Sequence, residues 1–196
     1  MKVLGLTGGI GMGKSTTAQL LQDRSVLVVD TDDLARIAVE PGQPALAEIH
    51  AQFGQDVIGR DGRLERGALA RLVFSDPAAR KKLEEILHPR IRELWRKQIN
   101  AWRSEGRSLA VVVIPLLFET SAETELDATI CVACSEASQI ERLSARNWSL
   151  EQIHQRINAQ WPIERKLVKA NYVIWTEASL EITALQLERI LQSAVG

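Results

Sequence analysis

The stretch Gly8-Gly9-Ile10-Gly11-Met12-Gly13-Lys14-Ser15-Thr16 decides the fold of this chain. From Gly8 to Ser15 it fits G-x-x-x-x-G-K-[ST], the phosphate-binding loop or P-loop motif. An apolar run over residues 2–7 precedes it and residues with helical spacing follow it, which is the strand–loop–helix context that the motif requires. An ordinary glycine-rich turn is the alternative, and four glycines followed by Lys-Ser in this context disfavour it. The stretch therefore predicts a site for a nucleoside triphosphate.

Anion capture explains why these residue types occur at this spacing. Glycines allow successive backbone N–H groups to turn toward one phosphate, and the N-terminus of the following helix adds partial positive charge. We expect Lys14 to reach the outer phosphates and to be catalytic, and the Ser15 hydroxyl to bind Mg²⁺. The candidate ATP-binding residues of the loop are Gly9, Gly11, Met12, Gly13, Lys14, Ser15 and Thr16.

Composition excludes several other classes of protein. The chain has 196 residues, of which 45% are hydrophobic and 25% charged, as in a globular protein with a sizeable core. A formal net charge of −1 favours neither a nucleic acid nor a membrane surface as a partner. No apolar run approaches the length of a membrane span, and the N-terminus predicts a strand and a functional loop rather than a signal peptide. We therefore expect a cytoplasmic monomer.

Cys131 and Cys134 form a C-x-x-C pair, which could indicate a metal or redox site. They lie in the run 128–134, which is typical of a buried strand, and residues three apart on a strand point to opposite faces. No second Cys/His pair with zinc-ligand spacing follows them. We therefore interpret both as core cysteines.

Apolar runs and helical patterns alternate along the rest of the chain. The run 109–114 lacks polar alternation, which is typical of a parallel strand buried on both faces. The pattern predicts an α/β fold: a doubly wound parallel five-stranded sheet of the P-loop kinase type. The expected strands are residues 2–7, 25–29, 109–114, 128–134 and 172–175, and residues 179–193 are expected to form the last helix.

Residues 41–106 are expected to be almost wholly helical. Asp76-Pro77 is a strong helix start, and His88-Pro89 is expected to interrupt that helix before a further one continues to about Arg103. This length exceeds a plain crossover, so we interpret the segment as a helical substrate-binding insertion. The core would then comprise 1–40, 107–138 and 170–196, with a helical lid at 139–169.

Charged side chains are placed where such a fold binds ligands. Asp30, Asp32 and Asp33 follow the second strand, at the sheet edge where open α/β sheets bind ligands. For Asp30 and Asp33, strand-end solvation or helix capping is the alternative role. In the expected lid, Arg142 and Arg146 are four residues apart and are expected on one helix face. A solvated helix face is the alternative there, but phosphoryl transfer requires mobile positive charge to neutralise the transferring oxygens.

The chain resembles the dephospho-coenzyme A kinases over nearly its whole length. The resemblance includes the P-loop, Asp30-Thr31-Asp32 with Ala35-Arg36, and Leu87-His88-Pro89 with Ile91-Arg92. Further similar segments are Val39-Glu40-Pro41-Gly42, Phe74-Ser75-Asp76-Pro77, Pro115-Leu116-Leu117-Phe118-Glu119, and the later residues Arg142, Arg146, Ser149, Arg156 and Gln160.

The resemblance implies ATP-dependent phosphorylation of the ribose 3′-hydroxyl of dephospho-coenzyme A, with Mg²⁺. It implies that Asp32 orients the hydroxyl or accepts its proton, and that Arg142 and Arg146 meet the ATP phosphates. The implied acceptor-binding residues are Asp32, Arg36, His88, Pro115, Leu116 and Leu117. For His88, a helix-breaking cap beside Pro89 is the alternative role. The run Trp175-Thr176-Glu177-Ala178 departs from the Asp-x-Asn-x-Gly type of segment that the family commonly has near the adenine, and Asn171 is a milder change from Asp.

Three rival functions are weaker. A GTPase needs N-K-x-D, which the chain lacks, and the D-x-x-G match at 56–59 falls in the helical insertion. A small kinase for a nucleoside or nucleotide monophosphate shares the P-loop, insertion and lid, but not the ordered set of segments. A regulatory ATP-binding protein would leave Asp32 and the lid arginines without a task.

Overall fold

The computed structural model describes residues 1–195 and divides the chain into two compact units. The first unit, here the sheet unit, joins residues 1–30 to the segment that begins at Trp102. The second, here the helical unit, is Thr31–Ala101. Each is described by itself, and the bounds of the substrate-binding insertion and the lid stay predictions. No helix of the described part of the chain is both long enough and apolar enough to span a membrane.

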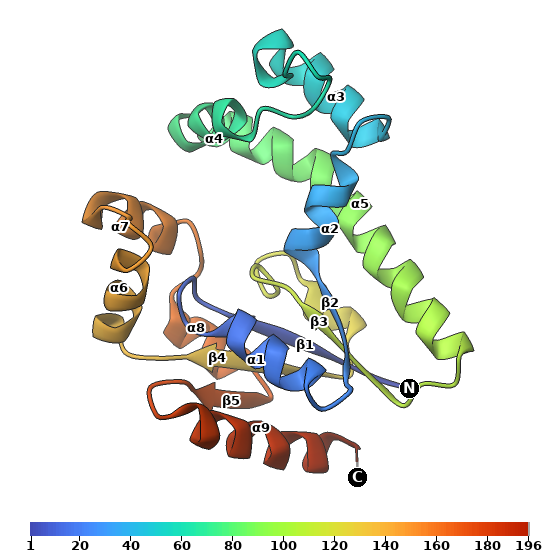
Figure 1. Ribbon diagram of the computed structural model, residues 1–196, viewed down its shortest axis with the longest axis vertical. Coiled ribbons are helices and arrows are strands. Elements are labelled where there is room, and N and C mark those ends of the chain that lie inside the picture. Colours follow the sequence, from blue (N-terminus) through green and yellow to red (C-terminus); the bar gives the residue numbers. More distant parts are fainter. Residues whose placement is uncertain (196) are drawn as a thin grey trace. The chain divides into compact units, whose positions relative to one another are not determined.

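The sheet unit contains five parallel strands in the order β2-β3-β1-β4-β5, and Figure 1 shows them as one twisted layer. The predicted parallel five-stranded sheet is confirmed. β1, which leads into the P-loop, is its central strand. The strands are β1 (Lys2–Gly8), β2 (Leu27–Asp30), β3 (Leu109–Val113), β4 (Ala128–Ala133) and β5 (Tyr172–Trp175). The helices are α1 (Lys14–Gln22), α6 (Glu136–Ser144), α7 (Leu150–Asn158), α8 (Ile163–Lys169), α9 (Leu180–Val195) and the short 3-10 helix η2 (Ala122–Glu125).

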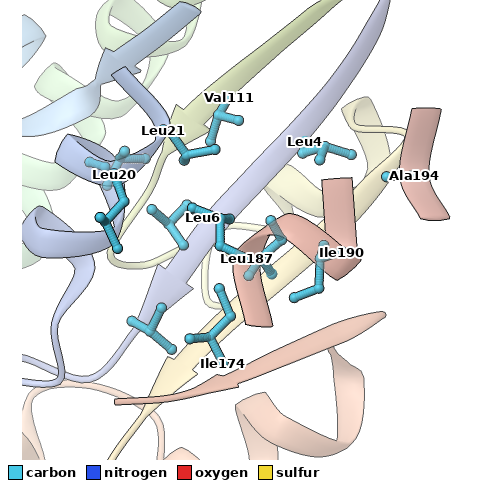
Figure 2. Packing of buried hydrophobic residues seen from close by; sticks show 13 residues of the cluster. Leu4, Leu6, Leu20, Leu21, Val111, Ile174, Leu187, Ile190 and Ala194 are labelled. Carbon is cyan, nitrogen blue, oxygen red and sulfur yellow. The ribbon is translucent and has the colours of Figure 1, made fainter. Parts of the chain in front are cut away.

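One buried cluster fixes α1 and α9 to the same face of this sheet (Figure 2). Register places Leu6 of β1 opposite Val113 of β3 and Ile130 of β4, so these side chains share that face. Leu21 of α1 and Leu187 of α9 pack on it and are fully buried. Burial of one such leucine contributes about 1.5–3 kcal/mol, so packing rather than helix propensity places the start of α1 at the end of β1.

The opposite face carries Thr7 and Cys131, which are paired in register. Cys131 and Cys134 are both free and buried, and burial raises the pKa of the Cys131 thiol to about 11. The interpretation of the pair as core cysteines is confirmed.

The start of β2 differs from the prediction. The strand begins at Leu27 rather than at residue 25 because Ser25 has φ 60°, in the left-handed region, and belongs to the turn that follows α1.

The helical unit packs around a second buried cluster that includes Val39, Ile49, Val57 and Leu69. Its elements are α2 (Thr31–Ala38), α3 (Pro44–Phe53), the 3-10 helix η1 (Gln55–Val57), α4 (Arg66–Ser75) and α5 (Pro77–Ser104), whose last turn passes into the sheet unit. The Asp76 side chain accepts a hydrogen bond from the amide of Ala78 at 2.8 Å, which confirms the predicted start of α5.

The predicted interruption at His88-Pro89 is wrong, because α5 continues through Pro89 as one helix. Proline removes one amide donor from the helical ladder, which is a local cost. Apolar contacts on both sides offset it: Leu83 and Leu87 before the proline pack against the cluster, and Trp95 after it is buried. Tertiary packing therefore outweighs the helix-breaking tendency of one residue.

Candidate active site

The P-loop joins the carboxyl end of β1 to the N-terminus of α1. Gly13 is the N-cap of α1 with φ 98°, a left-handed conformation that glycine adopts without strain. No side chain caps α1, and its first turn contains no acidic residue. The amides of this turn are therefore directed to an incoming anion rather than to a carboxylate of the chain itself.

Lys14 bends back over the start of the loop. Its Nζ donates to the carbonyl oxygens of Gly8 at 2.8 Å and Gly9 at 3.0 Å, and the residue is half-buried. The ammonium is therefore held against the loop as a point charge. Ser15 and Thr16, one and two residues further, are exposed at the N-terminus of α1.

Polar side chains from far along the chain hold the loop from outside. Gln139 of α6 donates to the Ile10 carbonyl at 2.7 Å, and the Ile10 amide donates to the Gln160 side chain at 3.0 Å. The Thr176 hydroxyl lies 3.0 Å from the Met12 carbonyl. Gln139 and Thr176 have no role predicted from the sequence, and Gln160 enters only through the resemblance, because a polar side chain that binds a distant backbone group leaves no periodic pattern.

Close packing explains two of the glycines. A Cβ on Gly11 would meet Leu143 of α6 at 2.8 Å, and one on Gly13 would meet Thr176 at 3.1 Å. Both residues also have positive φ, so a side chain there would be strained as well as crowded. The loop is therefore fitted to α6 and to the segment after β5.

Arg142 is engaged beside the loop rather than simply solvated. It lies in the last turn of α6 and is half-buried. Its Nη1 donates to the Thr176 hydroxyl at 3.0 Å, and its Nη2 donates to the Thr176 carbonyl at 2.6 Å. Thr176 in turn is 93% buried. Thr176 therefore links the Arg142 guanidinium to the Met12 carbonyl of the P-loop.

The expected placement of Arg146 on the same helix face as Arg142 is wrong. α6 ends at Ser144, and Arg146 is an exposed residue of the following turn. Asn147 has φ 61°, a left-handed conformation that asparagine tolerates and that ends the helix. The capping box at Ser149 and Gln152 then starts α7.

Glu177 organises the segment that departs from the resembled family. Its Oε1 accepts hydrogen bonds from the hydroxyls of Ser135 and Ser138, and its Oε2 accepts one from the Trp175 indole at 3.0 Å. The bonds from Ser135 and Ser138 are the main reason that the pKa of Glu177 lies below its usual value. The carboxylate is therefore a fixed negative charge between α6 and the end of β5.

The turn Pro115–Leu117, expected to border the acceptor, is held by a buried ion pair. Lys166 of α8 is fully buried, and its Nζ lies 2.8 Å from both the Pro115 carbonyl and Glu119 Oε1. The Thr7 hydroxyl also donates to the Pro115 carbonyl, at 3.2 Å. Leu117 packs into the core beside Gly5, so a substrate contact at this residue would use its backbone.

The remaining candidates belong to the helical unit. Asp32 is exposed in the first turn of α2, and Arg36, in its last turn, pairs with Asp33 at 2.9 Å. His88 is half-buried on α5. Its burial lowers its pKa, nearby Arg92 lowers it further, and Glu84 opposes the shift. The roles expected of Asp32, Arg36 and His88 stay predictions.

The donor set at the loop is compatible with Mg²⁺. Among residues 1–195, no three His, Cys, Asp or Glu side chains are grouped so as to hold a metal ion. Mg²⁺ does not require such a cage, because it commonly takes one or two protein oxygens together with substrate phosphates and water. The exposed Ser15 hydroxyl beside Lys14 fits that pattern.

A P-loop after the central strand of a parallel sheet, with an arginine held beside it, defines a kinase of the P-loop class. The family model for dephospho-CoA kinase matches residues 2–181. The chain therefore belongs to the dephospho-CoA kinase family, and it is an enzyme.

Relatives and solved structures agree with this assignment. The dephospho-CoA kinase of Syntrophotalea carbinolica is 43% identical over 196 residues, covering 100% of this chain and 93% of the relative. That of Bdellovibrio bacteriovorus is 40% identical, covering 98% and 96%. A Thermus thermophilus protein of known crystal structure is 38% identical in sequence and superposes with a TM-score of 0.85. The match covers 100% of this chain and 98% of that protein's chain. Dephospho-CoA kinase from Campylobacter jejuni, 27% identical, has a TM-score of 0.73 and the same coverage.

Proposed function

We propose that the chain transfers the γ-phosphoryl group of ATP to the ribose 3′-hydroxyl of dephospho-CoA, which gives CoA and ADP in the last step of CoA biosynthesis. The observation that carries this proposal is a complete P-loop with its lysine in place, in a chain whose match to the family extends over residues 2–181. A kinase for a nucleoside or a nucleotide monophosphate is the alternative, since it would share the loop, the sheet and the arginine.

The P-loop would hold the ATP phosphates through its amides, and Lys14 would neutralise charge that grows on the outer phosphates. Ser15 would hold Mg²⁺, which when bound would supply positive charge that neutralises the phosphates. Lys14 must then leave the carbonyls of Gly8 and Gly9 for phosphate oxygens, an exchange that costs little because both partners are hydrogen-bond acceptors.

Asp32 would orient the ribose hydroxyl or accept its proton. The transition state of phosphoryl transfer is loose, so the aim of the hydroxyl matters more than early removal of its proton. Arg142 would stabilise the transferring group and Arg146 would contact ATP. Arg36, His88 and the turn at Pro115, Leu116 and Leu117 would border the acceptor, within the insertion at 41–106 and the core.

The lid would be residues 139–169, and its contacts to Ile10 support that proposal. Gln139, at the start of this segment, donates to the Ile10 carbonyl, and Gln160, within it, accepts the Ile10 amide. We further propose that the enzyme acts as a cytoplasmic monomer, without a nucleic-acid or membrane partner. Light scattering during gel filtration would test the monomer through the mass of the eluted species.

An ADP-release assay that couples product formation to NADH oxidation tests the activity. ATP and Mg²⁺ are offered with dephospho-CoA, adenosine, AMP or a pantetheine derivative in parallel. Of the four acceptors, we expect only dephospho-CoA to be turned over, and we expect this turnover to be lost when Mg²⁺ is chelated. Faster turnover with adenosine or AMP would establish the alternative instead.

A further inference from the structure

We propose that Thr176 is a positioning residue that holds the Arg142 guanidinium beside the P-loop for phosphoryl transfer. The inference deepens the proposed function and rests on the role of Arg142 in it. Thr176 lies in the segment where this chain departs from the family pattern, and it touches three different parts of the sheet unit.

The hydrogen bonds of Thr176 leave little freedom for its side chain. Its hydroxyl has one proton and two carbonyl acceptors within reach, Met12 O at 3.0 Å and Ala133 O at 3.2 Å. Ala133 O already accepts the Thr176 amide at 2.8 Å, so the nearer Met12 carbonyl is the better acceptor. The lone pairs of the hydroxyl then remain for Arg142 Nη1.

Thr176 binds both Nη atoms of Arg142. A guanidinium has five N–H donors in a rigid plane, and Thr176 takes one from each Nη atom. Three donors remain, enough for a bidentate contact to phosphate oxygens while the grip is kept. Because Thr176 is 93% buried and also bound to the backbone of β4, it is a firm anchor for a long side chain that would otherwise lose conformational entropy on binding.

Contact with the loop itself makes the anchor relevant to the reaction. A Cβ on Gly13 would meet the Thr176 side chain at 3.1–3.3 Å, so Thr176 packs directly on the residue before Lys14. One hydroxyl thus sets the distance between the guanidinium and the loop that would hold the phosphates. Misplacement of a catalytic group by about 1 Å can cost on the order of 10²-fold in rate.

Thr176→Val keeps the shape of the side chain and removes the hydroxyl. We expect kcat to fall on the order of 10- to 100-fold, with KM for ATP changed only a few-fold, and Thr176→Ser to restore most of kcat. Thr183→Val is the matched control: Thr183 is also buried in the sheet unit, but its hydroxyl binds the Ser179 carbonyl of its own helix end. That variant should keep normal kcat.

A double-mutant cycle with Arg142→Ala separates positioning from a purely structural role. We expect Thr176→Val to have less than about a two-fold effect on kcat in the Arg142→Ala background, because the anchored group is gone. An equal effect in both backgrounds, or a folded Thr176→Val variant with unchanged kcat, would overturn the inference while the function stands. If Arg142→Ala itself retained full kcat, the role of Arg142 in the proposed function would fail and the inference with it.

Discussion

The P-loop and the helical unit differ in how firmly neighbouring residues hold their candidate groups. Around the loop, Gln139, Gln160 and Thr176 bind three backbone atoms, and Arg142 is bound in turn. On α2, Asp32 is exposed and Arg36 pairs with Asp33 at the surface. In the proposed function, phosphate capture would therefore depend on a preorganised backbone, whereas acceptor chemistry would depend on exposed side chains of a helix. The variants below test whether that division is real.

Asp32→Asn should have the largest effect. Asparagine keeps the size and one acceptor oxygen but loses the charge and the ability to take a proton. We expect kcat to fall on the order of 10²–10⁴-fold with ATP affinity little changed, as for a positioned general base. Steady-state kinetics with dephospho-CoA and a separate titration of ATP binding measure the two quantities. The matched control is Asp33→Asn, one residue on and also exposed, which should cost only a surface ion pair. If Asp32→Asn stays within a few-fold of the unchanged protein, the helical unit supplies no catalytic carboxylate at this position.

Lys14→Ala removes the positive charge of the lysine in the P-loop. Loss of one charged donor to a transferring group typically costs about 10²–10³-fold in kcat, and ATP affinity should fall as well. This combined loss would distinguish the loop from Asp32, where ATP affinity is kept. Lys81→Ala on α5 is the control, because its pair with Glu85 is weak and exposed. Undiminished turnover in folded Lys14→Ala would contradict the P-loop assignment.

Lys166→Met tests the scaffold under the turn at Pro115. Removing the buried ammonium leaves Glu119 uncompensated, and its Oε2 is already buried without a hydrogen-bond partner. Breaking such a pair typically costs about 3–5 kcal/mol in the free energy of unfolding. Lys169→Met, on the same helix, should cost less than Lys166→Met, because the Lys169 side chain is 42% exposed in its pair with Glu123 whereas Lys166 is fully buried. Urea unfolding curves measure both. Equal costs would mean that the buried pair contributes no more to the free energy of unfolding than the partly exposed one.

The P-loop and the helical unit were also unequally predictable from the sequence. Local rules predict the P-loop, the five strands and the cap at Asp76, since glycine conformation, apolar runs and N-cap side chains act within a few residues. Pro89 and Arg146 were misjudged because packing carries α5 through the proline, while a left-handed Asn147 ends α6 early. The partners of the loop, such as Gln139, lie more than a hundred residues away, and spacing along the chain cannot reveal them.

His88→Gln should have the smallest effect, and it tests whether His88 packs or binds. Burial lowers the pKa of His88 below its usual 6.5, so the folded protein resists a proton that the unfolded chain accepts. Stability contributed by neutral His88 is therefore present above pH 6.5 and is lost as the pH falls through the lowered pKa. Glutamine does not titrate, so the loss of unfolding free energy between about pH 7.5 and pH 5 should be smaller in the variant than in the unchanged protein. Equal losses would mean that the imidazole titrates alike in both states.

The same variant tests acceptor binding through its steady-state kinetics. A raised KM for dephospho-CoA at pH 7.5, with kcat unchanged, would add an acceptor contact to this packing role, because the neutral ring is the form present at that pH. An unchanged KM would mean that His88 is a packing residue of α5. Asp32 and Arg36 would then be the remaining candidates for acceptor binding in the helical unit.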